Sequence, residues 1–161
     1  MGRLFDAVAA LAGVRGVIQY EAQAAIDLET LAARHPEERG RYPFEIAEER
    51  EGRVIRIGVL IEAVTDDIRR GVPAGVIAAR FHNGVIVLVI SLCKLIARET
   101  GLRAAALSGG VFQNHLLTGR TAAGLEDTGL TVYTHRQVPC NDGGLSLGQA
   151  AIAGFSRVEE H

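Results

Sequence analysis

The last sixty residues alternate between short apolar runs and helical patterns, and this alternation constrains the fold more than any other feature. Residues 104–107 and 130–133 have the composition of short buried strands, whereas residues 111–125 and 143–153 have helical spacing. An order of strand, helix, strand and helix is typical of an α/β layer. The sequence therefore predicts an α/β fold that is rich in helices and has two or more short parallel strands.

Four more helices are expected before this region, at residues 4–13, 20–34, 57–70 and 73–99. The last of these contains a β-branched run at residues 85–90, which also suits a strand. The apolar positions around that run share one helical stripe, and no strong breaker interrupts it. We therefore expect one long helix over residues 73–99.

Residues 34–53 differ in composition from the rest of the chain. Eleven of these twenty residues are charged, against 25 in the other 141. Such a segment is typical of an exposed, solvated loop or excursion. Short strands could lie within and after it, at residues 42–46 and 54–57.

The length and composition favour a folded chain. For 161 residues and 17.2 kDa, area scaling predicts a folded surface of about 7,800 Å², with about two thirds of the unfolded surface buried. Hydrophobic residues make up 48% and charged residues 22% of the chain, which argues against disorder. We expect residues 1–161 to fold as one unit with a real core.

Charge and cysteine content restrict the compartment and the partners. A net charge of −2 does not give the protein the strong electrostatic field that would attract nucleic acids or membranes. Cys93 and Cys140 cannot form a disulfide framework, and the longest apolar run, residues 84–93, is about half a bilayer span. No leader-like segment precedes Gly2. We expect a cytoplasmic protein that binds neither nucleic acid nor membranes.

A first glycine turn, Ser108-Gly109-Gly110, links a predicted strand to a predicted helix. Glycines at a helix N-terminus let a phosphate approach unpaired backbone amides. The Lys-Ser/Thr of a Walker loop does not follow, so a tight structural turn and a phosphate cradle both remain open. Asn114 is expected one turn inside the helix, facing either a ligand or solvent.

A second glycine turn, residues 141–144, follows the second predicted strand. Asp142 there is either a helix N-cap or a carboxylate held at the carboxyl edge of the sheet, where open α/β sheets bind ligands. Asp6 lies near the start of the first predicted helix, where its carboxylate either stabilises the helix through the helix dipole or contacts a ribose. Because each glycine turn follows a strand, we expect the two turns to lie on the same edge.

The histidines show no metal-binding spacing. Neither HxxxH nor HExxH occurs among them, and no Ser-His-Asp or Cys-His arrangement can be argued from spacing. His82, within the long helix, is expected to be a packed or hydrogen-bonded histidine. A role for Cys140 as a soft metal ligand is the weaker interpretation of that residue.

Five blocks, in this order along the chain, resemble signatures of the HypF carbamoyltransferase family. A Gly-Gly-Val or an Asp-Gly alone would be a weak signal, but five blocks in register, including the Phe-Gln-Asn and Asn-Asp-Gly-Gly variants, are a strong one. The blocks are residues 2–9, 20–25, 78–83, 106–114 and 138–150. The resemblance covers nearly the whole chain, and the family matures nickel–iron hydrogenases.

The resemblance implies a position within a larger enzyme. Members of the family have an acylphosphatase-like module, a zinc-finger region, a carbamoyl-adenylate-forming module and a last domain similar to the tRNA threonylcarbamoyl transferases. That last domain has the actin-like, hexokinase-like ATPase fold. Residues 1–161 resemble only its final part, so we expect a single C-terminal lobe that is an incomplete second lobe of that fold.

The resemblance also implies roles for individual residues. Asp142 would ligate a divalent metal of the iron or zinc class, and Asp6 would contact the nucleotide ribose. The implied nucleotide-binding residues are Gly2, Asp6, Gly109, Gly110 and Asn114. The nucleotide would be ATP or carbamoyl-adenylate.

The implied reaction joins two steps. Carbamoyl phosphate and ATP give carbamoyl-adenylate, and the last domain transfers the carbamoyl group to the C-terminal cysteine thiol of a hydrogenase maturation protein. Neither cysteine of this chain needs to be catalytic. The expected partners are therefore that maturation protein and the upstream modules of the same enzyme.

The chain also departs from the family pattern. The paired histidine metal ligands and a strand hairpin are expected upstream of Gly2, Ala22 stands where glycine is frequent, and Cys140 where proline is frequent. The isolated chain is therefore expected to be inactive and to expose apolar surface or oligomerise. Two alternatives stay open: a non-catalytic nucleotide-binding or assembly module that complements a separately encoded remainder, and a sister carbamoyltransferase acting on small molecules or tRNA.

Overall fold

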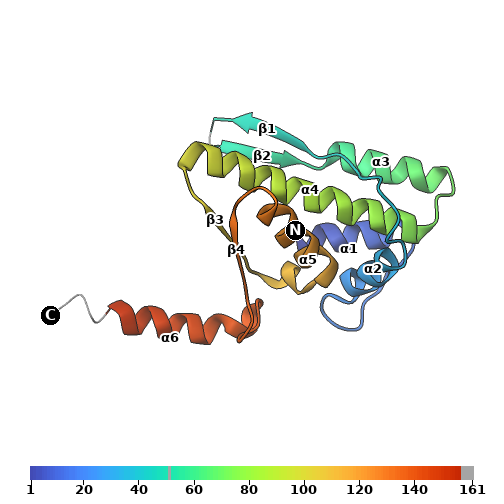
Figure 1. Cartoon of the computed structure of the whole chain (residues 1–161). Coiled ribbons are helices and arrows are strands. Elements are labelled where there is room, and N and C mark those ends of the chain that lie inside the picture. The colour runs from blue at the N-terminus through green and yellow to red at the C-terminus, as the bar shows by residue number, and fades with distance from the viewer. Residues whose placement is uncertain (51, 157–161) are drawn as a thin grey trace.

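One long helix, α4 (Ala74–Thr100), runs through the middle of the computed structural model, which describes residues 1–50 and 52–156 (Figure 1). Pro73 precedes it at the N-cap, and Gly101 ends it with a φ of 75°. The prediction of one long helix over residues 73–99 is confirmed. Because α4 packs against both α2 and α5, it organises the surrounding elements.

Three helices of the first half pack around α4. They are α1 (Gly2–Leu11), α2 (Gln23–Ala33) and α3 (Gly58–Arg69). The second begins three residues later than predicted because Ala22 adopts a left-handed conformation, with a φ of 63°. Glycine takes this conformation at little cost, which gives a physical reason for the glycine that the family resemblance associates with this position.

The core lies between α1, α2 and α4. Phe81 has no exposed surface, and its ring meets that of Phe5 edge to face with centroids 4.8 Å apart. Burial of such a side chain stabilises the fold by roughly 2–3 kcal/mol. The largest fully buried side chains of α1 to α4 are Phe81, Leu28, Leu60, Ile77, His82, Val8, Val64 and Val85.

Helix α4 is long and apolar enough to cross a membrane by length and composition alone. A buried core helix passes the same test, and half of the most apolar window of α4 is buried by the rest of the protein. Since α2 and α5 pack against it, we interpret α4 as a core helix. This agrees with the sequence-based interpretation of residues 84–93.

The charged segment contributes an antiparallel hairpin. Strands β1 (Glu45–Glu49) and β2 (Gly52–Arg56) pair with Glu45 opposite Arg56 and Glu49 opposite Gly52. The first strand thus starts three residues later than predicted. Arg53 donates hydrogen bonds to the Glu99 carboxylate, one with Nη1 to Oε2 at 2.8 Å, and these attach the hairpin to the end of α4.

A second, parallel pair of strands lies in the last third of the chain. Strands β3 (Ala104–Leu107) and β4 (Thr131–Thr134) run in register from Ala104 opposite Thr131 to Leu107 opposite Thr134. Helix α5 (His115–Glu126) connects them. The helix-rich α/β architecture with two short parallel strands is thus confirmed.

Two short 3₁₀ turns change the predicted helix boundaries. η1 (Gly110–Gln113) precedes α5, and η2 (Asp142–Gly144) precedes α6 (Leu145–Ser156). The single helix predicted over residues 111–125 is therefore wrong, because Asn114 separates η1 from α5. Helix α6 extends away from the other elements (Figure 1).

The molecule exposes more surface than its mass predicts. Its accessible surface is 10573 Å², against about 7,800 Å² expected for a compact chain of this mass. Helix α6 contributes to the excess, since Leu145, Leu147 and Phe155 are 59%, 57% and 78% exposed. The expectation that this chain exposes apolar surface is confirmed by these side chains.

Candidate functional site

The two glycine turns meet at the carboxyl edge of the β3–β4 pair. The backbone N–H of Gly109 donates to the carbonyl of Cys140 at 2.7 Å. A Cβ added to Gly110 would lie 3.9 Å from the Cβ of Asn141. The prediction that both turns share one edge is therefore confirmed, although they are about thirty residues apart in the chain.

Gly109 needs to be a glycine for conformational reasons. Its φ is 99°, in a region that residues with a side chain rarely adopt, and no other atom lies within 4 Å of a Cβ built there. The backbone is thus open to a ligand on that side. Open α/β sheets bind their ligands at this edge, beyond the carboxyl ends of the strands.

Asp142 is not the helix cap. Asn141 holds the N-cap position of η2, and its Oδ1 accepts from the N–H of Gly143 at 3.1 Å. The sequence-based N-cap interpretation of Asp142 is therefore wrong, since a neighbouring amide takes that role. Asp142 is the first residue of η2 and is exposed, so its carboxylate stays accessible at the edge.

Asn114 is the N-cap of α5, not a residue one turn inside it. Its Oδ1 accepts from the N–H of Leu117 at 2.8 Å, and its Nδ2 lies 2.9 Å from the His82 Nε2. Only 9% of the residue is exposed. Both ends of the side chain therefore hold the start of α5 against α4.

His82 is buried and neutral between these partners. Its Nδ1 lies 2.8 Å from the Ala78 carbonyl, so this nitrogen donates, and Nε2 accepts from Asn114. Burial lowers the pKa of His82 to about 4, because charging the ring away from water is costly. The expectation of a packed, hydrogen-bonded histidine is confirmed.

Gly2 and Asp6 lie on α1 and are exposed. Among the hydrogen bonds and ion pairs of residues 1–50 and 52–156, none joins either residue to a glycine turn. The connection is indirect: the ring of Phe5 lies edge to face with the His82 ring, at 5.3 Å, and His82 in turn binds Asn114. The core therefore couples α1 to the turn before α5.

Two further polar residues at the edge were not singled out from the sequence. The hydroxyl of Ser108 and the Nε2 of His135 are 2.8 Å apart and exposed. Each of the two residues directly follows a strand, since β3 ends at residue 107 and β4 at residue 134. That placement was the available signal, but the predicted second strand ended one residue early, at residue 133.

A complete metal site is not formed by the described residues. Within residues 1–50 and 52–156, no three His, Cys, Asp or Glu side chains are grouped so that they could hold an ion. Asp142 would supply one ligand, whereas structural and catalytic sites for transition metals use at least three protein ligands. The residues present here therefore do not fit such a metal by themselves.

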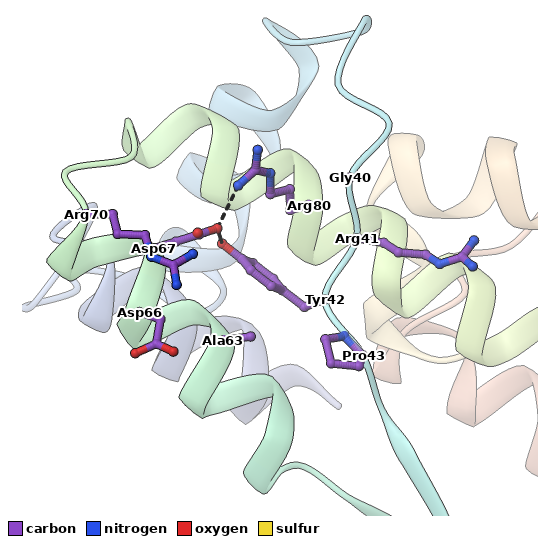
Figure 2. A pocket seen from close by; sticks show the side chains of 9 residues that line it. All are labelled: Gly40, Arg41, Tyr42, Pro43, Ala63, Asp66, Asp67, Arg70 and Arg80. Atoms are coloured by element: carbon purple, nitrogen blue, oxygen red, sulfur yellow. Dashed lines mark hydrogen bonds and ion pairs between the residues drawn. The ribbon is translucent and has the colours of Figure 1, made fainter.

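A separate polar cluster fixes the charged segment to α3 and α4. The hydroxyl of Tyr42 donates to the Asp67 Oδ2 at 2.7 Å, and the Arg80 Nη1 donates to the same oxygen at 2.8 Å (Figure 2). Burial and the bond to Asp67 raise the Tyr42 pKa well above its usual range. Burial alone would raise the Asp67 pKa, but the bonds from Tyr42 and Arg80 outweigh it and lower that pKa.

Comparison with known proteins decides the family. Residues 1–149 match the family model described as "Carbamoyltransferase, Kae1-like Domain, second subdomain". The chain belongs to the HypF carbamoyltransferase family. It is 35% identical over 149 residues to the carbamoyltransferase HypF of Synechocystis sp., and 38% identical over 161 residues to the HypF homolog of Cupriavidus necator.

Solved HypF structures have the same fold. The full-length HypF in its phosphate- and nucleotide-bound form matches with a TM-score of 0.89 and 44% identity, over 95% of this chain and 20% of that chain. The HypF of T. kodakarensis matches with a TM-score of 0.80 and 29% identity, over 99% of this chain and 20% of that chain. The strand and helix arrangement described above is therefore a HypF arrangement.

The chain spans only part of its HypF relatives. The match to the Synechocystis protein includes 92% of this chain but 18% of that protein. The match to the Cupriavidus protein includes 94% of this chain but 39% of that protein. The HypF enzymes are carbamoyltransferases as whole proteins.

Proposed function

We propose that this chain forms one side of the nucleotide site of a HypF-type carbamoyltransferase, as an incomplete second lobe of an actin-like ATPase fold. The observation that carries the proposal is the contact of the two glycine turns, with the Gly109 N–H bonded to the Cys140 carbonyl at 2.7 Å. That contact puts the open turn at Gly109, the second glycine turn and the exposed carboxylate of Asp142 at one sheet edge. Similarity to a nucleotide-bound HypF supports a nucleotide as the ligand.

In this proposal five residues contribute to nucleotide binding. Gly109 and Gly110 bring their backbone close to the phosphates, because neither carries a side chain that would block approach. Asn114 acts by fixing the turn, since both ends of its side chain are bonded within the protein. Gly2 and the Asp6 carboxylate contribute from α1, with Asp6 directed at ribose hydroxyls.

The proposed reaction uses carbamoyl phosphate and ATP. Carbamoyl-adenylate formed by the upstream modules donates its carbamoyl group to the C-terminal cysteine thiol of a hydrogenase maturation protein. A carbon–sulfur bond forms, the bond between the carbamoyl carbon and the phosphate oxygen breaks, AMP leaves and the thiol proton is released. In this chain's part of the site, the glycine turns orient the adenylate; the chemistry itself needs the rest of the enzyme.

A divalent metal of the iron or zinc class enters the proposal only through Asp142. Because the described residues do not form a metal site, we assign no step of the transfer to a metal bound by this chain. Asp142 is proposed as one ligand of a site whose other ligands come from outside residues 1–161. The reaction takes place in the cytoplasm, where thiols stay reduced.

A second candidate function is an assembly module that binds the rest of the carbamoyltransferase, encoded as a separate polypeptide. The apolar surface of α6 favours it, because Leu145, Leu147 and Phe155 are exposed on a helix without charged residues. Apolar surface of this kind is typical of a contact with another polypeptide. The two candidates differ in whether the chain contributes only contacts or also nucleotide-binding residues.

The first test compares the chain with and without the preceding region of a HypF relative. Each sample receives carbamoyl phosphate, ATP and a peptide that ends in cysteine, and carbamoyl transfer is measured by mass spectrometry. We expect no transfer by the 161-residue chain alone and transfer once the preceding region is supplied. Transfer by the isolated chain would refute the proposal that it is one side of a larger site.

A matched pair of glycine substitutions separates the two candidates. Gly109 and Gly129 both have positive φ, 99° and 84°, with open space where a Cβ would lie. Only Gly109 lies at the carboxyl edge, since Gly129 precedes β4. In the complemented enzyme, Gly109→Ala should weaken ATP binding by about tenfold, whereas Gly129→Ala should not. Equal binding by both variants would favour the assembly module.

A further inference from the structure

Three arginines from distant parts of the chain line one cavity outside the glycine turns. The cavity has a volume of about 400 Å³, and its lining includes Arg39, Arg41 and Arg120. The first two belong to the charged segment, and the third lies on α5, about eighty residues later. The sequence predicted only a solvated loop for the charged segment. The structure instead places two of its arginines beside an arginine of α5, which suggests a ligand-binding role for the segment.

The positive charge of this cavity is not neutralised by the protein. Within residues 1–50 and 52–156, Arg39 and Arg41 form no ion pair, and Arg120 donates to the neutral amide of Asn83 at 3.0 Å. The acidic residue of the lining is Glu38. An arginine cluster without a carboxylate partner favours an anionic ligand.

Glu38 does not supply the missing negative charge because its carboxylate is already engaged. One oxygen, Oε1, accepts from the backbone N–H of Gly40 at 2.6 Å. The other, Oε2, lies 3.3 Å from Nη2 of Arg80, which belongs to the polar cluster around Asp67. The three lining arginines therefore keep a net positive charge.

The backbone that carries Arg39 and Arg41 is held in place before any ligand binds. The Nδ2 of Asn83 donates to the carbonyls of Glu38 and Gly40, at 3.0 and 2.9 Å, on either side of Arg39. Arg120 binds the other end of the same amide and so fixes its orientation. A site ordered in advance loses less conformational freedom on binding.

Tyr42 and Arg41 are neighbours whose side chains leave the segment in different directions, although Arg41 also lines the pocket beside the polar cluster (Figure 2). The buried ring of Tyr42 reaches Asp67, whereas the side chain of Arg41 points away from Asp67 and Arg80 (Figure 2). The bond of Tyr42 to Asp67 and that of the Gly40 carbonyl to Asn83 fix the chain on both sides of Arg41. The polar cluster therefore positions an arginine for the cavity.

We propose that this cavity binds an oxyanion, as a phosphate or a carboxylate group, between the guanidinium groups of Arg39, Arg41 and Arg120. Guanidinium groups match both anions with paired N–H donors. The lining contains none of Gly109, Gly110 and Asp142, so this is a second site. The inference does not depend on the proposed carbamoyl transfer.

The test is a titration of the purified 161-residue chain, by calorimetry at low ionic strength. The probes are inorganic phosphate and a short neutral peptide with a free C-terminal carboxylate, with the C-terminally amidated peptide as a blank. We expect one of the two anions to bind, with an affinity that falls as salt is added. Phosphate binding alone identifies a phosphate site, and binding of the free but not the amidated peptide identifies a carboxylate site.

Substitutions with a matched control locate the site. Arg39 and Arg41 are exposed, so the double variant R39Q/R41Q should fold, as checked by circular dichroism. It should bind the anion at least about tenfold more weakly. The control, R98Q/R103Q, removes the same charge at exposed positions, and Arg98 lies about 16 Å from the cavity residue Val87 along α4.

Lysine variants test the paired donors separately from the charge. R39K/R41K keeps both charges but loses the fork geometry, so it should bind with intermediate affinity. Failure of both probes to bind the unaltered chain would overturn the proposal. Equal weakening by R98Q/R103Q and R39Q/R41Q would also overturn it, because it would show non-specific attraction to the whole protein.

Discussion

The helices before residue 100 and the strands and helices after it bury their apolar side chains to different extents. Phe81 of α4 has no exposed surface, whereas Phe155 of α6 is 78% exposed. The core around Phe81 is shared by α1 to α4 and by Leu117 of α5, which packs against α4. Helix α6 has a regular backbone without a comparable set of neighbours in the described residues, and packs mainly against η2.

This difference shows that local pattern and tertiary packing are separate requirements. The residues of α6 form a helix despite Gly148 and Gly154, yet the helix carries no charged residue and has an exposed apolar surface. A helix that is apolar on most sides is usually buried. The carboxyl edge of the β3–β4 pair belongs to the same region as α6, and Gly109, Gly110 and Asp142 are exposed there.

The largest expected effect comes from a matched pair of phenylalanine substitutions. Phe81→Ala removes a fully buried ring that contacts Phe5, and should lower the free energy of unfolding by about 3–5 kcal/mol. Phe155→Ala removes an exposed ring and should change it by less than about 0.5 kcal/mol. Urea denaturation followed by circular dichroism measures both.

The milder variant Phe81→Leu keeps the experiment informative if Phe81→Ala does not fold. It should lose about 1 kcal/mol, because it keeps most of the buried apolar volume. A loss for Phe155→Ala as large as that for Phe81→Ala would show that α6 is packed in solution as tightly as the core, and would remove the contrast between the two regions.

A smaller, pH-dependent effect is expected at the contact between the regions, His82 with Asn114. Burial lowers the pKa of His82 to about 4, below the 6.5 of an unfolded chain, so the unfolded state binds the proton more readily between these values. The contribution of His82 is therefore complete above pH 6.5 and is lost as the pH falls toward 4. The loss should reach up to about 3 kcal/mol at the acidic end.

Urea denaturation at a series of pH values measures this effect, with His82→Gln as the comparison. The variant removes the titrating group, so its free energy of unfolding should be lower at pH 7 but nearly constant between pH 6.5 and 4. The lowered pKa of Asp67 acts below its ordinary value of 3.8, outside this window, whereas the lowered pKa of Glu99, bonded to Arg53, acts below 4.5 and affects the variant and the unaltered chain alike. An unchanged slope in the variant would contradict the assignment to His82.

The sequence was sufficient for features that depend on local pattern. Helix α4 follows from its helical stripe of apolar residues, strand β3 from a short apolar run, and the parallel arrangement of β3 and β4 from the order of elements. The meeting of the two glycine turns also follows, because parallel strands end at one edge. The resemblance to the HypF family was also visible in the sequence, and the family model confirms it over residues 1–149.

Features that depend on contacts between distant residues could not be predicted. Asn114 interrupts the expected helix because its side chain bonds to His82, 32 residues earlier, as well as to Leu117. Asn141 replaces Asp142 as the cap, although both residue types suit that position. The arginine cavity joins Arg39 and Arg41 to Arg120, and sequence spacing gave no sign of it.

The smallest effect on stability is expected from α6, where a different measurement is decisive. Leu145→Ser with Leu147→Ser removes two exposed leucines and should change the free energy of unfolding by less than about 0.5 kcal/mol. The same variant should bind less of a hydrophobic dye and self-associate less in sedimentation, because Leu145 and Leu147 are two of the four large apolar side chains that α6 exposes. Leu102→Ser is the control, since Leu102 is 60% exposed outside α6. Equal dye binding by the α6 variant and the unaltered chain would mean that α6 is already covered in solution, and the difference between the two regions would then disappear.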